Sequence, residues 1–391
     1  MAKKRIFLFM VLYFIIFVAM SVSFTQYIPY LTALGYNEFQ KSFIQSSMAL
    51  ATIFAQLFFG FLSDKYRTIK KIMIVTLIAF TVAAVFFYGF ETSYFLFHVI
   101  SFVLYGVFYQ TTYMMQDNWV LESGDKVRAL FSSIRAFGSI GWAIGSMLIP
   151  MFIERFGYMG AGIATIIFSS LTLPVVLLLP DAEKAKEEKE PITLKHLNEL
   201  LARPAYVFAV LSTLFLYLVN ALNMIGVIDK MITLGATATH IGLKWSLQAV
   251  VEIPIFFIGS WLLKKFDATK LMFVSALTFT LQFLGFAFTS SITVILALST
   301  LQLITFPLMI LSVKNIIFDL SPDHLKSSGQ SIAMSICSGV SALATPIYIA
   351  FMIRNFNHTI MLLSGSVFGL LAMILIILLQ KKQKQHYENA G

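Results

Sequence analysis

Long apolar segments alternate with short polar ones from one end of the chain to the other. Each apolar segment is about 20 residues or longer, the length that an α-helix needs to cross roughly 30 Å of hydrocarbon. A barrel of alternating strands would show apolar segments about half as long. The pattern predicts an all-α integral membrane protein with twelve transmembrane helices, at approximately residues 6–33, 41–63, 71–90, 94–121, 130–155, 159–180, 203–229, 239–264, 270–289, 291–319, 326–353 and 358–379.

A sizeable hydrophilic interruption lies close to mid-chain, from Asp181 to Pro204, and separates six predicted spans from six. We therefore predict an N-terminal six-helix bundle at 1–180, a cytoplasmic linker at 181–202 and a C-terminal six-helix bundle with a cytoplasmic tail at 203–391. A weak internal repeat supports two pseudo-repeated halves. The segments GFLSDKYRTIKK after the second span and GSWLLKKFDATK after the eighth both follow a glycine with cationic residues.

The charges indicate how the chain lies in the membrane. About three quarters of the Lys and Arg residues fall in the N-terminus, the even-to-odd loops and the C-terminal tail, and such loops face the cytoplasm. The sequence thus predicts a multi-pass protein of the cytoplasmic (inner) membrane with both termini cytoplasmic. The net charge of +9 is scattered between spans instead of lying on one soluble face, so we expect no nucleic-acid partner.

The composition also excludes several classes of function. The chain is 58% hydrophobic and 12% charged, and Cys337 is its single cysteine. No metal cluster, nucleotide-binding glycine loop or soluble catalytic domain is evident, so we expect neither an enzyme nor a cofactor nor ATP-driven transport. The expected partners are a small solute, protons and the lipid bilayer, and the expected state is a monomer.

Polar residues line one face of the fourth predicted span. Gln110, Tyr113 and Asp117 lie at i, i+3 and i+7, which places them on one side of a helix, and Glu122 follows about a turn later. Ionisable groups inside hydrocarbon are costly, so this face is not expected to contact lipid.

The fifth span carries Arg135, Ser139 and Trp142 on one face. A buried arginine needs a carboxylate, and Asp117 or Glu122 is the natural partner. Two interpretations stay open at this point, a solute-binding site and a purely structural ion pair. The nearby glycines at 138, 141 and 145 predict close helix packing.

The remaining spans add amides, hydroxyls and aromatic rings. Such a lining suits a neutral polyhydroxylated solute better than a strong ion. These residues are Trp245, Gln248 and Glu252 on span eight, Tyr217, Asn220 and Asn223 on span seven, Ser299, Gln302 and Thr305 on span ten, and Gln282 on span nine.

Glu252 is the main candidate for a coupling proton, with Glu122 as the second. A low-dielectric cavity favours the neutral form of a carboxyl, which would let Glu252 bind and release a proton. The alternative is a carboxyl wetted by a central cavity with no coupling role. Lys314, Lys244 and His98 lie near span ends, where we expect their side chains to reach water.

Three motifs carry a resemblance to the major facilitator superfamily, within the branch that contains lactose permease and the 3-phenylpropionate and nucleoside transporters. Gly60-Phe61-Leu62-Ser63-Asp64-Lys65 is similar to the signature after the second span. The resemblance implies a conformational, gating role for Asp64 and Lys65. Arg135-Ala136-Phe137-Gly138-Ser139-Ile140-Gly141-Trp142 is similar to the span-five signature, in which the arginine binds substrate and, in lactose permease, the tryptophan stacks on a sugar ring. Trp245-Ser246-Leu247 followed by Glu252 resembles the span-eight signature of phenylpropionate-type members.

The chain also departs from lactose permease. Amides and hydroxyls stand on spans nine and ten where that permease has its charged residues, and Asn220 and Asn223 replace two span-seven aspartates. Galactoside specificity therefore does not carry over. The sequence predicts a secondary active transporter for proton-coupled uptake of a sugar or oligosaccharide by alternating access, or alternatively an exporter or carrier of aromatic acids, nucleosides or drugs with the same fold.

Overall fold

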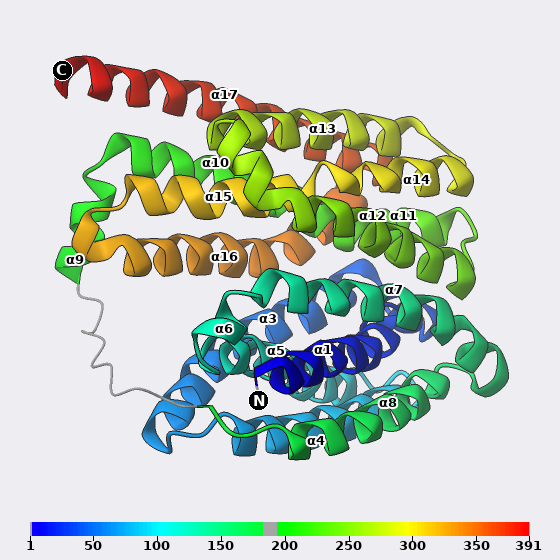
Figure 1. The fold of residues 1–391 in the computed structure, drawn as a ribbon. Helices are drawn as coiled ribbons and strands as arrows, with labels where there is room; N and C mark the ends of the chain where they lie inside the picture. The colour runs from blue at the N-terminus through cyan, green and yellow to red at the C-terminus, as the bar shows by residue number, and fades with distance from the viewer. Residues whose placement is uncertain (1, 183–193, 391) are drawn as a thin grey trace. The chain divides into compact units, whose positions relative to one another are not determined.

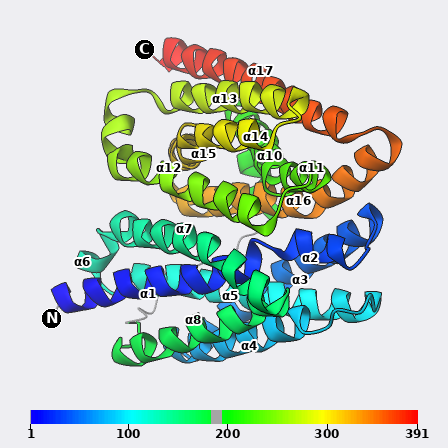
Figure 2. The same ribbon diagram turned by 90° about the vertical axis from the view of Figure 1, so that its right-hand side faces the viewer.

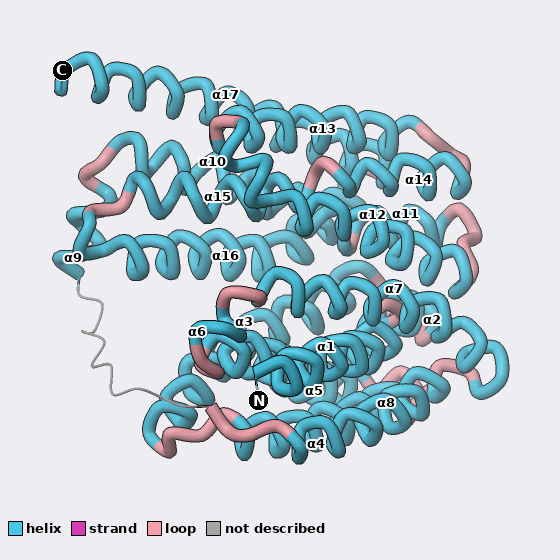
Figure 3. The backbone as a smooth tube through the Cα atoms, in the orientation of Figure 1, coloured by secondary structure: helices cyan, strands magenta, loops and turns pink. Residues whose placement is uncertain are grey.

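The computed structural model describes residues 2–182 and 194–390, and over these residues every regular element is a helix (Figure 3). Twelve helical spans are long and apolar enough to cross a membrane, which confirms the predicted all-α membrane fold. These spans are Lys3–Ala33, Glu38–Lys65, Lys70–Tyr88, Phe95–Leu121, Phe131–Phe156, Met159–Leu178, Pro204–Thr233, Ala238–Gly259, Ala268–Phe288, Ile292–Leu320, Gly329–Asn355 and His358–Gln383.

The chain folds as two compact units, which are described separately below. The first unit comprises Met1–Lys186 together with Met231–Phe257, and the second comprises Glu187–Lys230 and Ile258–Gly391. The predicted domain boundaries at 180 and 203 remain a prediction. In the first unit the helices are α1 (Ala2–Phe24), α2 (Tyr27–Ala33), α3 (Glu38–Lys65), α4 (Lys70–Tyr88), α5 (Phe95–Leu121), α6 (Asp125–Arg128), α7 (Phe131–Phe156) and α8 (Met159–Leu178).

The second unit contains α9 (Leu194–Leu201), α10 (Pro204–Met224), α13 (Ala268–Phe288), α14 (Ile292–Ser299), η1 (Thr300–Leu303), α15 (Phe306–Leu320), η2 (Asp323–Leu325), α16 (Lys326–Asn355) and α17 (His358–Ala390). The helices α11 (Gly226–Thr233) and α12 (Ala238–Lys265) divide between the units, at Lys230 and Phe257 respectively. Within the first unit α1 packs on α7 and α8, and within the second α17 packs on α10 and α13 (Figures 1 and 2).

Glycines on α7 allow α1 and α7 to approach closely. A Cβ atom on Gly141 would lie 2.2 Å from the carbonyl oxygen of Phe14, and one on Gly145 would lie 2.8 Å from that of Val18. A Cβ on Gly138 would touch the ring of Phe17 at 3.1 Å. The predicted packing role of these glycines is confirmed, because a larger residue would separate the two helices.

Three of the spans are interrupted within the membrane, which the apolar pattern did not reveal. Span one breaks at Gln26, between α1 and α2, and span seven breaks at Ile225, between α10 and α11. Span ten is divided into α14, the 3₁₀ turn η1 and α15, which starts at Phe306. Near this last break the carbonyl of Thr305 accepts a 2.7 Å hydrogen bond from the Ser275 hydroxyl on α13 as well as the backbone N–H of Met309 at 3.1 Å.

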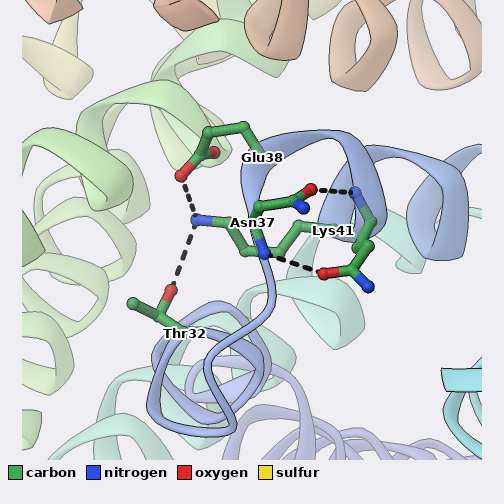
Figure 4. A network of polar contacts seen from close by, with 5 residues as sticks. Thr32, Asn37, Glu38 and Lys41 are labelled. Atoms are coloured by element: carbon green, nitrogen blue, oxygen red, sulfur yellow. Dashed lines mark hydrogen bonds and ion pairs between the residues drawn. The ribbon is translucent and has the colours of Figure 1, made fainter. Parts of the chain in front are cut away.

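The turn between α2 and α3 is fixed by polar contacts (Figure 4). The side chain of Asn37 accepts from the backbone N–H of Gln40 and the side chain of Gln40 accepts from that of Asn37, both at 3.0 Å, which makes a capping box. The ammonium of Lys41 is 2.8 Å from Glu38 Oε1 and donates to Thr32 Oγ1 at 3.3 Å. These contacts hold the ends of α2 and α3 together.

The C-terminal half of the chain repeats features of the N-terminal half about 200 positions later. Gly35 and Gly235 both adopt a left-handed conformation, with φ of 79° and 82°, after α2 and α11 respectively. Tyr30 on α2 donates to the carbonyl of Phe87 in α4 at 3.0 Å. Lys230 on α11 donates to the carbonyl of Phe286 in α13 at 2.6 Å. The same tie is therefore made by a phenol in one half and by an ammonium in the other.

Candidate solute site

Arg135 is the centre of a polar cluster in the first unit. Its Nη1 donates to Asp117 Oδ2 at 3.1 Å, and its Nη2 donates to the hydroxyl of Tyr113. The polar face of α5 thus meets that of α7, as the sequence predicted. Of the two candidate carboxylates, Asp117 pairs with Arg135, and Glu122 lies half-buried at the C-cap of α5.

Helix α1 completes this cluster with residues that the sequence reasoning missed. The hydroxyl of Tyr13 donates to Asp117 Oδ1 at 2.6 Å, so both carboxylate oxygens are occupied. The ring of Phe17 stacks on Tyr13, with centroids 5.8 Å apart, and contacts the rings of Tyr113 and Trp142. The spacing of Tyr13 and Phe17 at i and i+4 on a predicted helix was the signal available, but aromatic residues are common throughout this apolar chain.

Aromatic rings continue from this cluster. The rings of Phe24 and Trp142 have centroids 6.0 Å apart, as do those of Trp142 and Trp245, while Phe24 and Trp245 are 6.2 Å apart. Tyr109 stacks on Phe24 at 5.5 Å. The predicted stacking residue Trp142 therefore belongs to an aromatic group that also includes Trp245.

Lys244 does not reach water, contrary to our expectation. Its side chain is 0% exposed, its Nζ donates to Gln248 Oε1 at 3.1 Å, and it lies 4.6 Å from the centroid of the Trp245 ring. An amide oxygen and a π face both stabilise a desolvated ammonium, which explains how the lysine is accommodated. Glu252 lies one turn beyond Gln248 on α12 and is half-buried.

His98 is likewise fully buried instead of exposed at a span end. Its Nδ1 lies 2.8 Å from the Tyr36 hydroxyl and its Nε2 lies 3.1 Å from the Tyr30 hydroxyl. The two phenols supply the polar partners that water would otherwise supply. Lys314, by contrast, is exposed on α15, as expected.

The polar residues predicted on spans seven, nine and ten lie in the second unit. Asn223 Nδ2 donates to Gln302 Oε1 at 3.2 Å, and the Thr305 hydroxyl donates to the same oxygen at 3.3 Å. Gln282 instead donates to the carbonyl of Leu298 at 2.9 Å, next to Ser299. Two further residues contact methionine sulfurs at 3.8 Å, namely Tyr217 to Met334 and Asn220 to Met224.

Asp64 and Lys65, the residues expected to act in gating, lie exposed at the C-terminal end of α3. The carbonyl of Asp64 accepts from the backbone N–H of Arg67, a non-glycine residue with a positive φ of 49°. The loop that follows α3 therefore turns sharply, and its cationic side chains face outward from the unit.

The chemistry of the Arg135 cluster is that of a balanced pair. One guanidinium faces one carboxylate, and the hydroxyls of Tyr13 and Tyr113 extend the hydrogen-bond network. The Arg135 side chain retains 37% exposure and that of Asp117 retains 20%, so both can still be reached. Among the described residues no group of three or more His, Cys, Asp or Glu side chains is placed to hold a metal ion.

Comparisons with known proteins place this geometry in a family. The structure superposes on a nucleoside transporter, NupG, with a TM-score of 0.81 and 14% sequence identity, covering 96% of this chain and 99% of that one. It also superposes on a bacterial homologue of the human lysosomal transporter Spinster, in an inward-facing, occupied conformation, with a TM-score of 0.75, 13% identity and 97% of each chain covered. For the human organic anion transporter MFSD10 the TM-score is 0.67 at 12% identity, covering 96% of this chain and 99% of that one.

These identities show the fold alone, and no curated protein sequence matches the chain. The sequence matches the MFS_1-like family over residues 7–379, nearly its whole length. The chain therefore belongs to the MFS_1-like family and has the fold of the major facilitator transporters.

Proposed function

We propose that this protein is a proton-coupled secondary transporter that takes up a neutral, hydroxyl-rich solute containing a ring, in the first place a sugar or oligosaccharide. The observation that carries the proposal is the charge-balanced pair of Arg135 and Asp117, 3.1 Å apart, which the ring of Phe17 connects to that of Trp142 about two turns further along α7. Alternating access between two helical bundles is the mechanism this fold supports.

A hydroxyl group can both donate and accept a hydrogen bond. The Arg135 guanidinium can donate to it and the Asp117 carboxylate can accept from it. The guanidinium has five N–H donors, of which the described contacts with Asp117 and Tyr113 use two, and the carboxylate accepts. A charged solute would leave one member of the pair without its counter-charge, which is costly away from water. A neutral polyol fits this arrangement without that cost.

The aromatic residues favour a ring in the solute. Trp142 and Phe24 are half-buried neighbours in the same unit as the polar pair, and aromatic rings of this kind stack on the apolar face of a sugar or on a nucleobase. A nucleoside is therefore the second candidate, since it carries hydroxyls on one ring and an aromatic face on the other. The structural likeness to the nucleoside transporter NupG supports testing it alongside sugars.

Glu252 is the group to which we assign the coupling proton. It is the carboxyl on α12, inside the span Ala238–Gly259, one turn from Gln248. An ionisable carboxyl inside a membrane span costs free energy, so its presence there indicates a function. In transporters a common function of such a group is to bind and release a proton. Glu122, at the end of α5, is the second candidate for this role.

In this proposal the protein lies in the inner membrane, with both termini in the cytoplasm. The distribution of Lys and Arg supports it. In this orientation Asp64 and Lys65 lie at the cytoplasmic end of α3, where they would act on opening and closing and not on the solute. A monomer contains the complete set of residues that the proposal needs.

Counterflow into proteoliposomes tests the solute class. Sugars, oligosaccharides, nucleosides and aromatic acids would be presented to the purified protein and scored for exchange and for direction. We expect the neutral hydroxylated solutes to exchange and Arg135→Ala to abolish that exchange. Arg155→Ala is the matched control, because Arg155 lies at the exposed end of the same helix, α7. Exchange of aromatic acids alone would overturn the proposal.

A pH gradient across the same vesicles tests the coupling. Glu252→Gln should lose accumulation driven by the gradient while keeping exchange, since exchange needs no net proton movement. Glu154→Gln, at the exposed end of α7, should behave as the wild type. Accumulation at the wild-type level in Glu252→Gln would show that Glu252 does not carry the coupling proton. The same measurement on Glu122→Gln would then test the second candidate.

A further inference from the structure

The C-terminal end of α3 carries a lysine between two exposed aromatic rings. Lys65 Nζ lies 5.9 Å from the centroid of Phe61 and 5.6 Å from that of Tyr66. Phe61 is 61% exposed and Tyr66 is 63% exposed. Large rings so open to the surroundings are costly in bulk water but are typical of the boundary between lipid and water.

The C-terminal end of α12, in the second unit, carries the same arrangement. Lys265 Nζ lies 5.0 Å from the centroid of Trp261 and 5.7 Å from that of Phe266. Trp261 is 53% exposed and Phe266 is 43% exposed. Trp261 and Lys265 lie in the last turns of α12 and Phe266 follows its end, as Phe61, Lys65 and Tyr66 do at the end of α3.

The two clusters correspond position by position at an offset of 200 residues. Each has a ring at i, a lysine at i+4 and a second ring at i+5, at the end of an even-numbered span. The surrounding segments are basic in both halves. The segment 64–71 carries four Lys or Arg against one Asp, and the segment 264–270 carries three Lys against one Asp. Most positions differ between the two halves of the chain. The presence of this arrangement in both halves therefore indicates that it has the same role in each.

We propose that these two clusters bind the headgroups of anionic phospholipids in the leaflet at this surface. The rings sit at headgroup depth, and the lysine stem lies along them while its ammonium keeps N–H donors for a phosphate oxygen. The basic segments around each cluster add attraction to a negatively charged leaflet. A zwitterionic headgroup offers the same phosphate but no net charge, so anionic lipid is favoured.

Trp261 makes this proposal measurable. The chain has four Trp residues, of which Trp119 and Trp245 are buried and Trp142 is half-buried, so Trp261 is the exposed reporter. The full-length protein would be reconstituted in phosphatidylcholine vesicles that contain an equal share of brominated phosphatidylglycerol or brominated phosphatidylcholine. The difference in quenching between wild type and Trp261→Phe isolates the signal of Trp261.

We expect brominated phosphatidylglycerol to occupy the site about fivefold more than brominated phosphatidylcholine, the factor for one surface lysine near an anionic leaflet. Lys265→Gln should remove this preference and Lys265→Arg should keep it. Lys126→Gln, an exposed lysine on α6, should leave it unchanged. Phe61→Trp supplies the corresponding reporter for Lys65→Gln on α3.

Two outcomes would overturn the proposal. Equal quenching by the two brominated lipids in the wild type would show that the rings only contact lipid without selecting it. Loss of the preference on adding inorganic phosphate would show a soluble anion site instead of a lipid site. Neither result depends on transport, so this experiment tests the lipid sites independently of the proposed solute.

Discussion

Asp181 accepts hydrogen bonds at the start of α4, and Lys70 donates hydrogen bonds at the end of α8. Asp181 Oδ1 accepts the backbone N–H groups of Lys70 at 2.9 Å and of Ile69 at 3.0 Å, at the start of α4. In return Lys70 Nζ donates to the carbonyls of Leu177 and Leu179 at 2.7 Å, at the end of α8. A carboxylate at a helix N-terminus and an ammonium at a helix C-terminus are both favoured by the helix dipole. The loop after α3 is thereby fixed to the residues that follow α8.

This pair makes stability depend on pH. Partial burial alone would raise the pKa of Asp181, but hydrogen bonds from the Thr68 hydroxyl and from three backbone N–H groups lower it below its ordinary value. A lowered pKa in the folded state contributes stability that is fully present above the ordinary carboxyl value of about 4 and is lost as pH falls through the lowered value.

We expect Asp181→Asn to lower the melting temperature at neutral pH and to flatten its fall in acid, which thermal unfolding in detergent would measure. Asp125→Asn, on the exposed helix α6, is the control and should change neither. Equal acid sensitivity in wild type and Asp181→Asn would contradict the assignment. Asp267 has a similarly lowered pKa, since hydrogen bonds from Thr269 outweigh its own partial burial, so some acid sensitivity will remain.

Removing the hydroxyl of Tyr13 should weaken solute binding without disrupting the fold. Tyr13→Phe keeps the stacking on Phe17 but deletes the donor to Asp117, and losing one hydrogen bond to a charged group costs about 1.5–3 kcal/mol. Tenfold to a hundredfold is therefore roughly the upper limit of the expected loss in affinity, reached when the whole cost appears in solute binding. Tyr206→Phe is the matched control, because the Tyr206 hydroxyl donates to the carbonyl of Gly329 in the second unit. A similar loss of affinity in both variants would argue against the site.

Lysine should not replace arginine at position 135. The planar guanidinium reaches Asp117 with one nitrogen and Tyr113 with the other, and a lysine ammonium is a single point of donation. Arg135→Lys should therefore keep expression and folding but lose at least about tenfold in solute affinity, measured by titration calorimetry or by equilibrium binding. Wild-type affinity would show that only the charge at this position matters.

Adding one methyl group between α1 and α7 should destabilise the protein. In Gly141→Ala the new Cβ would lie 2.2 Å from the Phe14 carbonyl oxygen, so the two helices must separate. We expect a loss of about 1–3 kcal/mol, measured by thermal or denaturant unfolding. Gly60→Ala on α3 meets nothing within 4 Å and should be neutral or slightly stabilising, because alanine favours a helix. A neutral Gly141→Ala would mean that the α1–α7 contact is more pliable than the structure shows.

The sequence predicted the membrane fold because hydropathy summed over about 20 residues is a strong signal. The same averaging hides a local break. Gln26, Ile225 and Thr305 each interrupt a helix inside a segment that is apolar on both sides, so the sum over the segment does not change.

The candidate site was predictable only where polarity contrasts with its surroundings. Asp117 and Arg135 stand out in apolar helices. The helical spacing placed each on a polar face of its own helix, and the need of a buried arginine for a carboxylate predicted that the two faces meet. Tyr13 and Phe17 carry no such contrast in a chain with 39 Phe and 15 Tyr, so their contribution emerged only from the contacts of α1 with α5 and α7. Lys244 was wrongly expected to reach water, because the sequence does not show which side chains near a span end are covered once the helices have packed.

The interruption of span ten changes how that span responds to force. Pro307 has no N–H to offer to the preceding turn, and the Thr305 carbonyl also accepts from Ser275 on α13. Bending α15 against α14 at this point therefore breaks fewer regular helical bonds than bending an unbroken helix would. Span ten can therefore change its tilt near Thr305, close to the Gln302 amide, with less disruption than a continuous helix would suffer.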